Sequence, residues 1–300
     1  MDWAPLCNFT HYSLLKGYSK PEQLATKCKE NGYKFCGIAD YKSVSGAVNF
    51  VKSCRKQGVR PIIGCSFDGF TLFAKNIEGW FDLIKLISSL DEDGQLPQKY
   101  LVSICSKGNL ISIAKDEKLS PIYGEDFYKK SEWLKDTYYC EKSDADLHRI
   151  LLCSSMKKTL PKVYSALKKN EDVDHKEFFI SNEFHVPNRT EICEFIGEEG
   201  EQDIIDICNK CEDFNILRKP SLPTFKTPTG ESEEEYLKQL CREGWRDVLI
   251  NSGKVKNEEA KQKYLERFKS EFDVINDANL FGYFLIVRDI INYVESKGWL

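Results

Sequence analysis

The sequence predicts an α/β fold followed by a mainly helical C-terminal segment, and two observations carry this prediction. Over the first half of the chain, short apolar runs such as 35–39, 59–65 and 70–74 alternate with amphipathic stretches. This alternation is typical of a sheet covered by helices, either open or closed into a barrel. After the proline-rich stretch at 219–230, three helical patterns follow at 233–249, 258–275 and 281–296. We therefore expect two domains, 1–218 and 219–300.

Residues 33–67 form the unit around which the first domain is organised. Two buried strands at 35–39 and 59–65 flank a helical pattern, so we expect them to be parallel. Polar side chains at the ends of such strands meet at one edge of the sheet. Asp40, Tyr41 and Ser66 therefore mark a candidate ligand site.

The later part of the first domain is less regular. An apolar run at 101–105 is followed by a turn, and 110–114 is predicted as a helix. An edge strand is expected within 126–139, and helices are expected over 143–153 and 191–214.

Composition limits the class of protein. Hydrophobic residues make up 41% of the 300 residues, which is enough for a substantial core, and the net charge is −4. This charge argues against a free-standing, non-specific nucleic-acid binder, although a partner domain could supply a positive groove. The apolar runs are far too short for a membrane span, and no secretory signal is visible at the N-terminus. We expect a cytoplasmic protein without a membrane partner.

The twelve cysteines mostly occupy apolar positions of predicted helices and strands. We interpret them as reduced core residues of a cytosolic protein. The alternative is a structural zinc site at Cys208 and Cys211, but two further ligands are not evident nearby.

Several motifs resemble bacterial DNA polymerase III alpha subunits, the C-family replicative polymerases. HYSLLKG at 11–17, the segment GIADYKSVSGAVNFVKSCRKQGVRPIIGCSF and TLFAKNIEGWFDLIKLIS at 71–88 resemble their N-terminal PHP domain. SLPTFKTPTGESEEEYLKQLCREGW at 221–245 and GYFLIVRDIINYVESKG at 282–298 resemble the region that follows, the start of the palm. The resemblance covers essentially the whole chain and implies a PHP-type distorted (β/α) barrel for the first domain.

The resemblance also implies where a PHP metal cluster, of Zn²⁺ or Mn²⁺, would sit. Such clusters use His, Asp and Glu ligands at the strand ends. In this sequence the corresponding positions are Cys7, Phe9, His11, Asp40, Tyr41, Ser66, Gly69, Asp136 and Tyr138. Because Phe, Tyr, Ser and Gly bind hard divalent ions poorly, we expect a degenerate site without its metals. The weak metal candidates that remain are Asp40, Asp136, His11 and Cys7, and a single ion held by the first three is the alternative.

The other histidines give little indication of a site. His148 is interpreted as a packing or helix-surface residue, while His175 and His185 lie in irregular polar segments and carry no signal.

The function implied by the resemblance is that of the N-terminal part of a replicative DNA-directed DNA polymerase subunit, a nucleotidyltransferase. The family's palm aspartates, which bind Mg²⁺, are expected beyond Leu300, so we expect no catalytic residue and no polymerase activity in this portion alone. The PHP domain would be a scaffold that packs against the palm and thumb. Primer–template DNA, a proofreading exonuclease and the sliding clamp are the implied partners of the complete polymerase. The alternatives are a metal-dependent 3′–5′ exonuclease or phosphoesterase, and an interaction module of a split polymerase.

Overall fold

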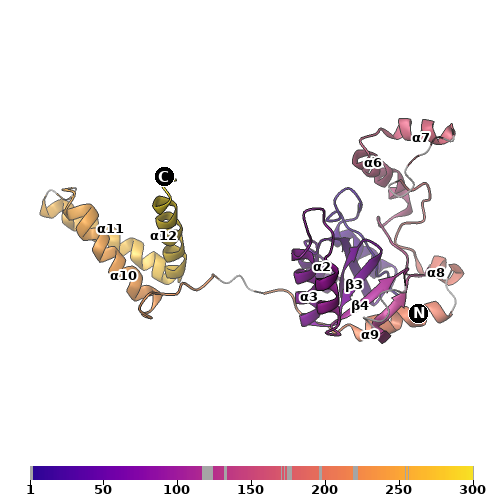
Figure 1. Ribbon diagram of the computed structural model, residues 1–300, viewed down its shortest axis with the longest axis horizontal. Coiled ribbons are helices and arrows are strands. Elements are labelled where there is room, and N and C mark those ends of the chain that lie inside the picture. The colour runs from indigo at the N-terminus through magenta and orange to yellow at the C-terminus, as the bar shows by residue number, and fades with distance from the viewer. Residues whose placement is uncertain are drawn as a thin grey trace. The chain divides into compact units, whose positions relative to one another are not determined.

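The computed structural model describes residues 3–116, 124–131, 134–169, 171, 173, 178–195, 198–218, 222–253, 255 and 257–299. The chain divides into two compact units, Met1–Arg218 and Lys219–Leu300, and each is described by itself (Figure 1). The first unit is α/β and the second is helical, so the predicted fold class is confirmed.

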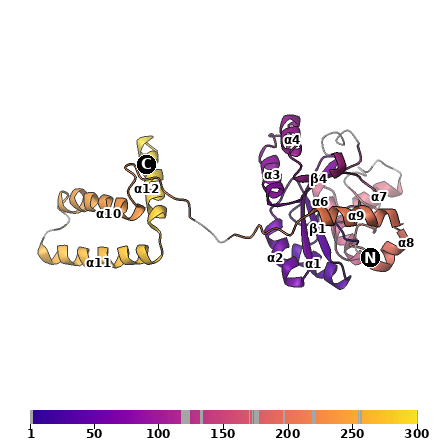
Figure 2. The same cartoon turned by 90° about the horizontal axis from the view of Figure 1, so that it is seen from below.

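The first unit consists of a mixed sheet with helices around it. Its strands are β1 (Phe35–Tyr41), β2 (Arg60–Phe67), β3 (Phe70–Ala74), β4 (Leu110–Ala114) and β5 (Phe127–Lys129). Its helices are α1 (Pro21–Glu30), α2 (Ala47–Gln57), α3 (Ile77–Ser88), α4 (Gln98–Cys105), α6 (Ala145–Ser155), α7 (Leu160–Lys168), α8 (Arg189–Phe195) and α9 (Glu198–Lys210). In Figure 2 the strands lie between α1–α4 on one side and α9 on the other.

The strands are ordered β1-β2-β3-β4-β5 across the sheet. β1 and β2 are parallel, as predicted, and Tyr41 pairs with Ser66 at their carboxyl ends. β3 is antiparallel to both β2 and β4, and β4 is parallel to β5. The polar ends of β1 and β2 therefore lie side by side.

Backbone hydrogen bonds extend the sheet beyond β1. Gly37 donates to Pro5 O at 2.8 Å, and Phe9 donates to Thr137 O at 2.8 Å. Gly37 is required there, because a Cβ at this position would lie 2.2 Å from Leu6 O. Beyond β1, the sheet is thus continued by residues 5–9 and then by the segment around Thr137.

Two elements differ from the sequence prediction. Residues Leu110–Ala114 form strand β4 rather than a helix, and the apolar run before them lies in helix α4. The predicted helix over 191–214 corresponds to α8 and α9, and α9 ends at Lys210. A short apolar run satisfies both helical and strand patterns, and here pairing with β3 decides in favour of the strand.

The cysteines are mostly buried thiols. Among the cysteines whose side chains the structure describes, all but Cys241 are buried. Cys208 and Cys211 pack in the main core with Ile204 and Ile207. Burial raises the pKa of the Cys211 thiol to about 12, so it is protonated at neutral pH and is a poor zinc ligand.

The second unit contains α10 (Glu233–Gly244), a π-helical segment (Trp245–Ile250), α11 (Glu258–Asp277) and α12 (Phe281–Ser296), in agreement with the predicted helices. Its core is formed by Leu237, Phe272, Phe281 and Leu285. The helix α10 begins at Ser232, whose Oγ accepts a hydrogen bond from Glu235 N at 3.2 Å. Within the described residues of both units, no helix has the length and apolar character needed to cross a membrane.

Candidate functional site

A pocket of about 300 Å³ lies at the carboxyl ends of β1 and β2. It brings together most of the positions that the sequence singled out, although they are far apart along the chain. Phe9, Tyr41, Ser66, Gly69, Asp136 and Tyr138 all line it. The strands thus place these residues in one cavity, and its chemistry depends on what they contact.

Asp40 is buried at the end of β1 and is fully engaged by hydroxyl and amide donors. One of its carboxylate oxygens accepts from Thr10 N and Ser13 Oγ, each at 2.6 Å, and the other accepts from Thr10 Oγ1 at 2.8 Å. Burial raises the pKa of this carboxyl, while the hydrogen bonds from Ser13 and Thr10 oppose the shift. Through these contacts, Asp40 anchors the loop that contains Thr10 and Ser13.

Asp136 forms an ion pair with Lys130, which follows β5. Although burial disfavours the lysine ammonium, the nearby Cys7 and Asp136 raise the pKa of Lys130, so it stays charged. Cys7 is itself buried, and burial raises the pKa of its thiol to about 12. At neutral pH the carboxylate therefore already has a cationic partner, and the thiol is protonated.

His11 interacts electrostatically with Asp40, but its ring contacts other groups. Its side chain is exposed, its ring lies 4.4 Å from the Tyr12 ring, and its Nδ1 lies 3.4 Å from Ser19 O. In the parts of the chain that the structure describes, no three His, Cys, Asp or Glu side chains are grouped so as to hold a metal ion.

Aromatic rings occupy the side of the pocket where the resemblance places histidine ligands. Phe9 and Tyr138 stack with their ring centroids 4.8 Å apart and an interplanar angle of 17°. Tyr138 also contacts the rings of His148, Phe179 and Phe184, at 5.4, 5.1 and 5.7 Å. Burial raises the pKa of the Tyr138 phenol well above its usual range. The Phe9 and Tyr138 rings lack the nitrogen or carboxylate ligands that a PHP metal cluster would need at these two positions.

The sequence reasoning missed the lysines of this pocket. Lys16, Lys115 and Lys130 line it, and Lys42 lies at its edge, bonded to Asp68 at 2.7 Å. Lys42 directly follows β1, at the strand end where a ligand-binding loop is expected, and Lys16 lies in the loop after residues 5–9, which pair with β1. That position was the available signal for these two. No signal in the sequence pointed to Lys115, because the residues before it, now strand β4, were predicted as a helix.

His148 is buried, which agrees with a packing role, and its Nε2 lies 2.7 Å from the backbone oxygen of Lys16. Because a carbonyl can only accept, the imidazole is the donor. Burial lowers the pKa of His148, which favours the neutral ring. His148 therefore holds the loop that carries Lys16. His175 lies outside the described residues.

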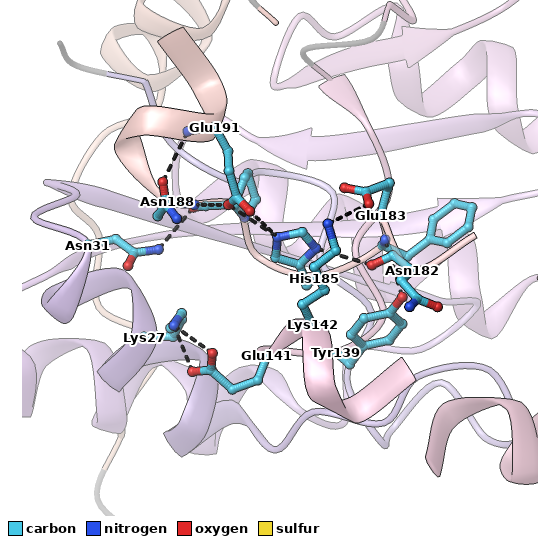
Figure 3. A network of polar contacts seen from close by, with 12 residues as sticks. Lys27, Asn31, Tyr139, Glu141, Lys142, Asn182, Glu183, His185, Asn188 and Glu191 are labelled. Carbon is cyan, nitrogen blue, oxygen red and sulfur yellow. Dashed lines mark hydrogen bonds and ion pairs between the residues drawn. The ribbon is translucent and has the colours of Figure 1, made fainter. Parts of the chain in front are cut away.

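A second polar network surrounds His185 (Figure 3). His185 is 5% exposed, and its Nε2 lies 3.1 Å from a carboxylate oxygen of Glu191. Asn188 and Glu191 exchange two hydrogen bonds, of 2.7 and 3.0 Å, at the start of α8. The spacing of Asn188 and Glu191 is a capping-box signature that the sequence analysis overlooked. The network links the start of α8 to the segment that carries His185.

Comparisons with family models give two matches. Residues 8–184 match the PHP domain. Residues 235–300 match the region described as the bacterial DNA polymerase III alpha NTPase domain.

Curated relatives are similar to nearly the whole chain. The DNA polymerase III subunit alpha of Aquifex aeolicus is 27% identical, over 99% of this chain and 32% of the relative. The subunit of the same name from Helicobacter pylori is 27% identical over 96% of this chain and 30% of the relative. That from Bacillus subtilis is 26% identical over 99% and 30%. The chain thus spans about a third of the length of these relatives.

One solved structure, from Bifidobacterium adolescentis and described as a candidate metal-dependent phosphoesterase, aligns with 13% identity. The alignment covers 69% of this chain and 74% of that one, with a TM-score of 0.28. Overlap at that level carries no conclusion about this chain.

Proposed function

Because this chain belongs to the PHP domain family, we propose that it is the N-terminal part of a replicative DNA polymerase subunit whose PHP unit is a scaffold. The order of the two family matches supports this proposal: a PHP domain is followed by a polymerase III alpha region in one chain. Similarity to DNA polymerase III alpha subunits over 99% of the chain is the observation that carries it.

The scaffold role rests on the contacts within the pocket. A hydrolytic PHP site needs ligands that converge on divalent ions. Here Asp40 is bonded to Thr10 and Ser13, and Asp136 is paired with Lys130. We infer that the pocket has lost its Zn²⁺ or Mn²⁺ ions and does not cleave phosphodiesters.

In this proposal, nucleotidyl transfer belongs to the part of the relatives that this chain does not match, where Mg²⁺-binding aspartates of the palm would align primer and nucleotide. The 300 residues by themselves would not synthesise DNA. Their contacts would be with the palm and thumb, and through the whole polymerase with primer–template DNA, a proofreading exonuclease and the sliding clamp. The protein would act in the cytoplasm.

The experiment has two parts. The purified chain is equilibrated with Zn²⁺ or Mn²⁺, freed of excess metal and analysed for bound metal, then incubated with a 3′-labelled primer–template. We expect neither bound metal nor shortening of the primer. Stoichiometric metal together with loss of 3′ nucleotides would instead establish the exonuclease alternative.

The polymerase assignment is tested separately by tagging the chain in its native cells. Tagged material should extend a primer when Mg²⁺ and nucleotides are added. If the extending activity resides in a separately encoded polypeptide that copurifies, the split-polymerase alternative is correct. If no extension is found, the polymerase assignment is wrong.

A further inference from the structure

The pocket at the ends of β1 and β2 carries an excess of positive charge. Lys16, Lys115 and Lys130 line it together with Asp68 and Asp136. Lys130 is paired with Asp136, and Asp68 is paired with Lys42. Within the described residues, no carboxylate forms an ion pair with Lys16 or Lys115, although the charge of Lys16 helps to lower the pKa of Asp68. Counting Lys42, four ammonium groups thus face two carboxylates. Such a cavity repels divalent cations and attracts anions.

Lys16 is held in place by its backbone. Its carbonyl oxygen bonds to the buried His148 at 2.7 Å, and its amide donates to Ser13 O at 2.9 Å. Leu15, just before it, has φ of 59°, a left-handed conformation that is uncommon for a branched side chain. Strained residues of this kind cluster at functional sites. The loop therefore holds the Lys16 backbone in a fixed position beside the pocket.

The ammonium groups of Lys16 and Lys42 both contact the aromatic ring of Tyr41. The Nζ atoms of Lys16 and Lys42 lie 4.7 and 4.9 Å from the Tyr41 ring centroid. Lys42 also has a left-handed backbone, with φ of 50°, and its side chain is only 16% exposed. The Tyr41 hydroxyl donates to Asp68 at 2.6 Å, which fixes the ring. Both ammonium groups thus lie against the Tyr41 ring, with the Lys42 side chain largely buried and the Lys16 side chain exposed.

Lys130 supplies the partly buried end of the site. Its side chain is 17% exposed and bonded to Asp136. An ammonium group carries three N–H donors, so Lys130 can bond to an anion while keeping Asp136. Ser66 and Thr71, whose hydroxyls are 2.8 Å apart, also line the pocket and offer neutral donors.

We propose that this pocket binds a phosphoryl oxyanion directly, through Lys16, Lys115 and Lys130, where the family would use metal ions. Lysine is a compact point charge suited to phosphate. A volume of about 300 Å³ is at the lower end for ligand pockets, so the occupant is a small phosphate or the phosphate end of a larger molecule. The inference rests on the proposed function in one respect, the absence of pocket metals.

The test is isothermal titration of the full chain with inorganic phosphate and with pyrophosphate, in EDTA and at constant ionic strength. We expect saturable binding tighter than about 1 mM. A short oligonucleotide with a 5′ phosphate is then compared with its 5′-hydroxyl form. Tighter binding of the phosphorylated form would identify a DNA end as the source, and equal weak binding of both would identify free phosphate. Either result agrees with the proposal.

Two double variants separate the pocket from general charge. Lys16→Gln with Lys115→Gln removes the two ammonium groups that form no ion pair in the pocket, and each substitution should weaken binding by about tenfold. The control, Lys29→Gln with Lys56→Gln, removes the same charge from exposed positions on α1 and α2, and it should bind as the unaltered chain does. All four side chains are exposed, so neither variant should unfold the protein, and circular dichroism checks this.

Three results would overturn the proposal. These are the absence of saturable binding to every phosphate probe, equal losses in the two double variants, and binding that disappears in EDTA. The third would mean that a metal mediates the contact, and the metal analysis described above would then contradict the scaffold role as well. Failure of phosphate binding with no bound metal would leave the scaffold role intact.

Discussion

Replacing Tyr138 by alanine tests whether aromatic packing in the pocket supports the fold. Tyr138 contacts four rings, those of Phe9, His148, Phe179 and Phe184, at centroid distances from 4.8 to 5.7 Å. Truncating a buried aromatic residue to alanine costs about 3–5 kcal/mol, and aromatic pairs contribute roughly 0.5–1.5 kcal/mol beyond the area that they bury. Because Tyr138 is only partly buried, we expect a loss of about 3 kcal/mol in the free energy of unfolding.

The assay is urea unfolding followed by hydrogen-exchange mass spectrometry of peptides from the first unit, so that the helical unit does not contribute. Tyr138→Phe keeps the ring and should lie within about 0.5 kcal/mol of the unaltered chain. Tyr100→Ala makes the same truncation at a position that is 48% exposed and should also change little. A Tyr138→Ala variant as stable as Tyr100→Ala would refute the idea that the rings stabilise the pocket.

Three further predictions concern neighbouring residues. Burial raises the pKa of Asp40 in the folded state above its ordinary value of 3.8. The folded state is therefore favoured while Asp40 is protonated, and this stabilisation is lost as pH rises through the folded pKa. Asp40→Asn should abolish this loss of stability, as measured by urea unfolding at a series of pH values. Burial lowers the pKa of His148, so stability should fall as pH drops below the ordinary value of 6.5, and His148→Phe should flatten that slope. Gly17→Ala would place a Cβ 2.1 Å from Thr10 O, so the melting temperature should fall, by the equivalent of about 2 kcal/mol or more.

The sequence was sufficient for the central unit because its signals are local. Strands β1 and β2 each show an apolar run with a polar end, and parallel pairing then brings Tyr41 next to Ser66. No long-range information is needed for that step. The helices of the second unit were predicted for the same reason, since apolar residues repeat along α12 and Ser232 with Glu235 begins α10.

The composition of the pocket could not be predicted in the same way. Lys115 reaches it only because β4 pairs antiparallel with β3, and five consecutive apolar residues do not distinguish a strand from a helix. Asp136 was considered as a metal ligand, but its partner Lys130 could be found only once β5 had been placed at the edge of the sheet. Such pairings depend on strand order, which local patterns do not specify.

The pattern of contacts in the pocket follows from the cost of buried charge. A carboxylate that lacks a metal ion must find other donors, because an unpaired charge in the interior is strongly destabilising. Asp40 finds them in Thr10 and Ser13, and Asp136 finds a cation in Lys130. Since both aspartates are satisfied without metals, the additional ammonium groups of Lys16 and Lys115 are not needed to balance them. An anionic occupant of the pocket would give both ammonium groups a partner that neither aspartate provides.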